Sequence, residues 1–129
     1  MDKRPVLIVE DEAPLQQIVQ DALEEAGFAV TVSASGEEAI ERLQRQDPAF
    51  VALVTDIQLS RPSVTGWDVA HRARELDGAL PVIYMTGAAA ADWPSNGVPN
   101  SILVTKPFAP AQIVTAVSQL LNAGNAAGC

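Results

Sequence analysis

The chain has 129 residues, of which 48% are hydrophobic, and this length and composition suit one globular domain with a buried core. Its formal net charge of −8 disfavours non-specific nucleic-acid binding, because the phosphates would be repelled. The first apolar run ends after four residues at Glu10, too short for a secretory signal or a membrane helix, so we expect a cytoplasmic protein that binds no membrane.

Five short apolar segments, separated by helical patterns, predict β-strands. They span Val6–Val9, Ala29–Val32, Val51–Thr55, Pro81–Met85 and Ser101–Thr105. Three of them, "VLIV", "VALVT" and "PVIYM", are almost continuously apolar. Such runs are typical of parallel strands that helices cover on both faces.

Amphipathic helices are predicted between these strands over about 15–26, 35–43, 69–76 and 110–121. The apolar stripe of the first includes Ile18, and Gly27 is placed to end that helix. Ser35 and Glu38 predict a capping box at the start of the second helix. Pro110 suits the first turn of the last one.

The segment between the fourth and fifth strands predicts only a short or irregular fourth helix, because Pro94, Gly97 and Pro99 interrupt it. The end of the chain, from Asn122, is predicted to fray. We find no repeat and no linker, so we expect one domain over 1–129, with a core of about 3–123 and a tail over 124–129. Alternating strands and helices predict an α/β fold with a doubly wound, five-stranded parallel sheet.

Polar side chains follow four of the predicted strands. Glu10 and Asp11 follow the first strand, Asp56 the third, Thr86 the fourth and Lys106 the fifth. Because the carboxyl ends of parallel strands build the site in such sheets, we expect these residues around one shallow pocket. Three carboxylates there would raise one another's pKa unless a cation joined them, and hard oxygen ligands suit Mg²⁺.

The same segment excludes several nucleotide-binding classes. The chain contains neither G-x-G-x-x-G nor G-x-x-x-x-G-K-[ST], and "EDEAP" replaces the Gly-rich or hydroxyl-rich turn that such proteins need after the first strand. A carboxylate can instead act as a nucleophile toward phosphorus. The charge that develops on the phosphoryl oxygens would be met by Mg²⁺, the Lys106 ammonium and the Thr86 hydroxyl or nearby backbone amides.

The motifs "LIVEDE", "VTDIQL", "YMTG" and "TKPF" resemble the response-regulator receiver domain of two-component signalling. The resemblance runs from about Lys3 to about Ala123, and the four motifs occur in the right order at the right strand ends. It implies a flavodoxin-like strand order of 2-1-3-4-5. It also implies that a histidine kinase or a histidine phosphotransfer protein donates a phosphoryl group.

Individual site roles follow from this resemblance. It implies that Asp56 is the phosphoacceptor and that Thr86 and Lys106 bind the phosphoryl oxygens. It further implies that Mg²⁺ is held by Glu10, Asp11, Asp56 and the backbone carbonyl of Gln58. The Lys106–Pro107 bond is a candidate cis peptide, as in similar receivers.

Two departures from the family pattern bear on how this chain would pass a signal to a partner after phosphorylation. Leu103 stands where similar receivers place an aromatic residue that rotates on activation. Gly66 lies ten positions after Asp56, so the loop over Ser60–Thr65 is about two residues longer than usual. Ser60 or Arg61 could therefore reach the phosphate or gate water.

We expect a stand-alone receiver that signals to an unknown downstream protein through contact, with a homodimer as one form of it. The alternatives are a pseudo-receiver that binds partners without phosphorylation, and a phosphate sink in a relay. We do not expect an enzyme that turns over an external substrate. Phosphatases resembling the haloacid-dehalogenase class need a second Asp two residues after the nucleophile, where this chain has Gln58.

Overall fold

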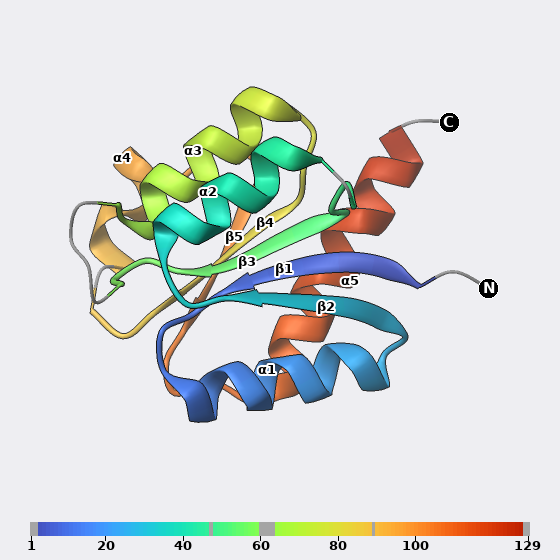
Figure 1. Cartoon of the computed structure of the whole chain (residues 1–129), viewed down its shortest axis with the longest axis horizontal. Coiled ribbons are helices and arrows are strands. Elements are labelled where there is room, and N and C mark those ends of the chain that lie inside the picture. Colours follow the sequence, from blue (N-terminus) through green and yellow to red (C-terminus); the bar gives the residue numbers. More distant parts are fainter. Residues whose placement is uncertain (1–2, 47, 60–63, 89, 128–129) are drawn as a thin grey trace.

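A five-stranded parallel β-sheet with helices on both faces forms the protein in a computed structural model (Figure 1). The structure describes residues 3–46, 48–59, 64–88 and 90–127. The strand order β2-β1-β3-β4-β5 confirms the predicted fold class and topology. The strands are β1 (Arg4–Val9), β2 (Phe28–Ser33), β3 (Ala52–Asp56), β4 (Val82–Thr86) and β5 (Ser101–Thr105).

Two layers of helices enclose the sheet (Figure 1). On one face lie α1 (Ala13–Glu25) and α5 (Pro110–Ala127), and on the other lie α2 (Gly36–Arg45) and α3 (Gly66–Leu76). Between β4 and β5 the chain forms a short 3-10 turn, η1 (Ala90–Asp92), and the four-residue helix α4 (Trp93–Asn96). The predicted interruption of the fourth helix is therefore confirmed.

The core consists of two apolar clusters, one on each face of the sheet. Along β1, Leu7 and Val9 pack in the cluster beneath α2 and α3, whereas Val6 and Ile8 pack in the cluster above α1 and α5. All four side chains are fully buried, and each such burial contributes about 1.5–3 kcal/mol to folding. This explains why the strand is continuously apolar rather than alternating.

Capping residues set several of the helix ends. Gly27 has φ of +99° just after α1, a conformation that suits glycine. Ser35 accepts a hydrogen bond from the Glu38 backbone N–H at 3.2 Å, but the Glu38 carboxylate pairs with Arg42 and does not complete the predicted capping box.

A complete capping box lies at α3, where the sequence analysis did not predict one. The Thr65 hydroxyl accepts from the Asp68 backbone N–H at 3.2 Å, and the Asp68 carboxylate accepts from the Thr65 backbone N–H at 3.0 Å. The reciprocal pair fixes the point at which the long loop after β3 enters the helix.

Two other expectations were wrong. Ile18 is 47% exposed, because it lies one position away from the buried line through Val19 and Leu23. Helix α5 ends at Ala127, beyond the predicted end near residue 121, and the predicted fraying of the tail stays a prediction. Residues 128 and 129 lie outside the described part of the chain. Within that part, no helix has both the length and the apolar character needed to cross a membrane.

Candidate functional site

The predicted site residues come together at the carboxyl edge of the sheet. Glu10 and Asp11 follow β1, Asp56 ends β3, Thr86 ends β4 and Lys106 follows β5. Parallel pairing in register brings these strand ends level with one another. The convergence that the sequence predicted is therefore present in the structure.

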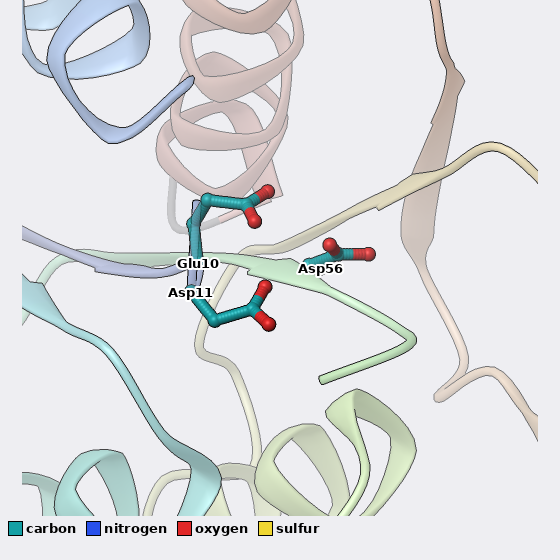
Figure 2. A group of neighbouring side chains, drawn as sticks. All are labelled: Glu10, Asp11 and Asp56. Atoms are coloured by element: carbon teal, nitrogen blue, oxygen red, sulfur yellow. The ribbon is translucent and has the colours of Figure 1, made fainter. Parts of the chain in front are cut away.

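Three carboxylates form the centre of the site. Figure 2 shows the carboxylates of Glu10 and Asp11 pointing toward Asp56. Each contributes a carboxylate oxygen to a group whose members all lie within 4.8 Å of one another. Glu10 is fully buried and Asp56 is 5% exposed, whereas Asp11 is only half-buried. Clustered oxygen donors at an open edge fit the preference of Mg²⁺ for a few carboxylates and several waters.

The environment of Glu10 raises its pKa. Burial of its side chain, followed by the nearby negative charge of Asp56, raises its pKa from 4.5 to about 7. The Glu12 backbone N–H, which donates to Glu10 Oε2 at 3.1 Å, and the Lys106 ammonium oppose this rise in pKa. Uncompensated negative charge at this position is costly, and a cation joining the carboxylates would relieve that cost.

Lys106 supplies the positive charge of the site. Its Nζ lies 2.9 Å from Asp56 Oδ2 and 3.3 Å from Glu10 Oε1, and its side chain is 24% exposed. Burial lowers the pKa of Lys106, but the hydrogen bond and charge of Asp56, together with Glu10, outweigh burial and raise it. The side chain therefore remains an ammonium at neutral pH. As predicted, the Lys106–Pro107 peptide bond is cis.

Backbone and hydroxyl groups complete the surroundings of Asp56. The Gln58 backbone N–H donates to Asp56 Oδ1 at 3.3 Å, which places the Gln58 backbone beside the acid. That the Gln58 backbone carbonyl binds Mg²⁺ stays a prediction. The Thr86 hydroxyl is buried and accepts from the Ala88 backbone N–H at 3.2 Å.

The loop after β3 ends at Gly66, the first residue of α3, which lies very close to the backbone of Asp56. The Gly66 backbone N–H donates to the Ile57 carbonyl at 2.8 Å, and a Cβ built on Gly66 would lie 2.0 Å from the Asp56 carbonyl oxygen. Only glycine fits this approach. Ser60 and Arg61, one of which could reach the phosphate or gate water, lie outside the described residues.

One contact at the site was missed from the sequence. The Gln16 side-chain amide, from the first turns of α1, donates to the backbone carbonyl of Glu10. The only sequence signal for this contact is that Gln16 lies six residues after Glu10. Many helical residues lie at such a spacing from a strand end, so the spacing alone does not predict the contact. The contact ties α1 to the acidic segment.

Aromatic side chains from neighbouring elements pack in the same apolar cluster as Leu103. Tyr84 is paired with Leu103 in the β4–β5 register, and its ring lies 4.8 Å from that of Trp67 on α3. The Tyr84 hydroxyl accepts a hydrogen bond from the Val98 backbone N–H at 3.1 Å. Trp93 also packs against this core and donates to the Ser101 hydroxyl. The aromatic residues of this region thus come from β4, α3 and α4 rather than from β5.

Comparison with known proteins gives one consistent family. A family model described as the response regulator receiver domain matches residues 6–118. The chain is 36% identical over 120 residues to the response regulator receiver protein CpdR of Brucella abortus, covering 92% of this chain and 97% of that protein. It is 35% identical to the probable transcriptional regulatory protein TcrX of Mycobacterium tuberculosis, covering 91% of this chain but 49% of that longer protein.

A solved structure shows the same architecture. The response regulator receiver protein from Sinorhizobium medicae WSM419 superposes with a TM-score of 0.90 and is 48% identical in sequence. The match covers 95% of this chain and 97% of the other. Sequence and fold therefore agree over nearly the whole length.

Proposed function

This chain belongs to the response-regulator receiver family, and on that premise we propose that it accepts a phosphoryl group on Asp56 and signals through protein contact. Receiver domains of this family interact with histidine kinases, and a histidine kinase or histidine phosphotransfer protein is the proposed donor. The observation that carries the proposal is the contact of Lys106 Nζ with Asp56 Oδ2 at 2.9 Å, beside the three clustered carboxylates. Such a function belongs in the cytoplasm.

The transfer step follows from the chemistry of an aspartate nucleophile. An Asp56 carboxylate oxygen attacks the phosphorus of a phosphohistidine, a P–O bond forms, and the P–N bond breaks. The leaving imidazole takes up a proton from solvent, and Asp56 becomes an acyl phosphate. No general base is needed, because the nucleophile carries no proton.

The protein stabilises the charge that develops on the transferred group. The Lys106 ammonium, already in contact with Asp56, neutralises one phosphoryl oxygen, and the Thr86 hydroxyl can turn to donate to another. Glu10, Asp11, Asp56 and the Gln58 carbonyl are the proposed holders of Mg²⁺. When bound, the metal ion would supply further positive charge for the phosphoryl oxygens.

We propose a switch rather than an enzyme with an external substrate. The position two residues after Asp56, where a phosphatase of the haloacid-dehalogenase type needs an acid, carries the exposed Gln58. Gln58 cannot act as a general acid. The product therefore stays on the protein, and phosphorylation would change its surface for a downstream partner.

Two other roles remain as alternatives in the same family. A phosphate sink would use the same Asp56 chemistry, and it differs only in what happens after transfer. A pseudo-receiver would bind partners without phosphorylation, and the assembled Glu10, Asp11, Asp56 and Lys106 cluster argues against it.

The direct test is incubation with acetyl phosphate, with and without Mg²⁺, followed by intact-mass measurement. We expect one Mg²⁺-dependent phosphoryl addition to the native protein and none to Asp56→Asn. Glu12→Gln is the matched control, because it removes an adjacent acid outside the proposed metal site and should phosphorylate normally. A folded protein that gains no phosphoryl group from acetyl phosphate or from a panel of histidine kinases would favour the pseudo-receiver.

Metal binding is tested separately. Asp11→Asn removes the most exposed of the three carboxylates and should weaken Mg²⁺ binding at least tenfold, measured by tryptophan fluorescence titration. Unchanged affinity would exclude Asp11 as a ligand.

A further inference from the structure

The turn between β1 and α1 carries two of the three clustered carboxylates. It consists of Glu10, Asp11 and Glu12, all of them acidic. Asp56 lies within reach of the first two, so electrostatic repulsion acts on this turn when no cation is bound. The carboxylates converge in the structure despite this repulsion, so other contacts must hold the turn in its shape.

The start of α1 does not hold the turn through a helix cap. A capping side chain normally satisfies the first N–H groups of a helix and fixes where the chain enters it. Glu12 occupies the N-cap position, but its side chain makes no capping hydrogen bond. The contact between α1 and the turn comes instead from Gln16, which is half-buried and whose side-chain amide donates to the Glu10 backbone carbonyl.

Glu10 is also fixed at several other points. Its backbone N–H donates to the Ser33 carbonyl at 3.1 Å. Its carboxylate accepts from the Glu12 backbone N–H and from Lys106. These contacts hold the Glu10 side chain without the amide from α1. That amide acts on the Glu10 carbonyl, which belongs to the planar peptide unit leading into Asp11, so it fixes the direction in which the chain enters Asp11.

We propose that Gln16 is a positioning residue for the metal site, because its bond to the Glu10 carbonyl aims the Asp11 carboxylate toward the site before Mg²⁺ binds. The inference rests on the proposed Mg²⁺ site and deepens it. An amide suits this task, since it donates a hydrogen bond without adding charge to a site that binds a cation. A carboxylate that is already aimed loses less freedom when the ion binds, and this raises the affinity for Mg²⁺.

The test is a Mg²⁺ titration of the full chain, followed by tryptophan fluorescence. Gln16→Met keeps the length of the side chain but cannot donate, and it should bind Mg²⁺ about fivefold more weakly, the effect of losing one hydrogen bond. The matched control is Gln17→Met, which removes an amide that donates to Asp21 Oδ1 at 2.7 Å on the exposed side of α1. It should stay within about twofold of the native affinity. Equal weakening in the two variants would overturn the proposal, because the cause would then be a general change in α1.

A double-mutant cycle tests whether Gln16 acts through Asp11. Asp11→Asn lacks the carboxylate that the amide is proposed to aim. In that background Gln16→Met should change the Mg²⁺ affinity by less than about twofold, because the two substitutions then remove parts of the same interaction. An undiminished effect of Gln16→Met in the Asp11→Asn protein would overturn the proposal, since the amide would then act elsewhere.

The Mg²⁺ dependence of phosphorylation separates positioning from a direct part in the transfer. With acetyl phosphate, Gln16→Met should need about fivefold more Mg²⁺ for its half-maximal rate, and at saturating Mg²⁺ it should come within about twofold of the native rate. A lower saturated rate with an unchanged Mg²⁺ requirement would contradict the proposal. The titration needs no phosphoryl transfer, so the two failures are distinguishable. A native protein that binds Mg²⁺ but is never phosphorylated refutes the proposed function, whereas native Mg²⁺ affinity in Gln16→Met refutes the positioning role.

Discussion

Replacing Glu10 with Gln should stabilise the Mg²⁺-free protein at neutral pH. The substitution keeps the shape of a fully buried side chain, but its one carbonyl oxygen can accept from only one of the two donors, the Glu12 backbone N–H on Oε2 or Lys106 on Oε1. It removes a negative charge that lies beside Asp56. We therefore expect that the charge of Glu10, which the metal site needs, lowers the free energy of unfolding of the Mg²⁺-free protein.

The magnitude follows from the pKa of Glu10, which is raised from 4.5 to about 7. A group with a raised pKa contributes stability that is fully present below the unfolded value and is lost as pH rises through the folded value. For Glu10 the loss falls between pH 4.5 and about 7 and amounts to about 3 kcal/mol at 1.36 kcal/mol per pH unit.

The assay is urea unfolding in EDTA, followed by tryptophan fluorescence, at about pH 5 and about pH 8. We expect the free energy of unfolding of Glu10→Gln to exceed that of the native protein by about 1–2 kcal/mol at the higher pH, and to fall about 1 kcal/mol below it at the lower, because the hydrogen bond that glutamine cannot keep costs about the same at both. Glu12→Gln, at an exposed neighbouring acid, should stay within about 0.5 kcal/mol at both. A Glu10→Gln effect that is the same at both pH values would refute the electrostatic reasoning.

Three other substitutions test separate parts of the account. Lys106→Ala should slow phosphorylation by acetyl phosphate at least tenfold in a mass-spectrometric time course, because the ammonium contacts Asp56; a native rate would contradict this. Gly66→Ala should lower the free energy of unfolding by about 2–4 kcal/mol, since its Cβ meets backbone at 2.0 Å, whereas Gly78→Ala, with 3.9 Å of room, should stay within about 1 kcal/mol. Tyr84→Phe keeps the ring and should cost about 1 kcal/mol by urea unfolding; no change would show that its hydroxyl bond contributes nothing.

Much of the site could be predicted from the sequence because strand ends are local signals. The apolar runs locate the strands, parallel pairing places their carboxyl ends at one edge, and the polar residues that follow must then meet. Glu10, Asp11, Asp56, Thr86 and Lys106 were all located in this way. The family resemblance added their expected roles, which the geometry alone does not assign.

Other features depend on contacts between distant segments, which periodicity does not encode. The pairing of Lys106 with Glu10 joins residues 96 positions apart. Together with the Glu12 backbone N–H, it opposes the effect of burial on that acid. The tilted ring contact of Trp67 with Tyr84, and the hydrogen bond from the Val98 backbone N–H to the Tyr84 hydroxyl, likewise appear only when α3, β4 and the α4 segment are packed together. The capping box at Thr65 was visible as T-x-x-D, but the long loop before it obscured where α3 begins.

The central claim is that Asp56 carries the phosphoryl group, and chemical trapping tests it most directly. Borohydride reduces an aspartyl phosphate to homoserine, so the Mg²⁺- and acetyl phosphate-treated protein can be reduced, digested and mapped by peptide mass spectrometry. The account predicts homoserine at position 56 alone, and none when Mg²⁺ is omitted. Homoserine at another aspartate, or a phosphorylated protein with Asp56 unmodified, would contradict it.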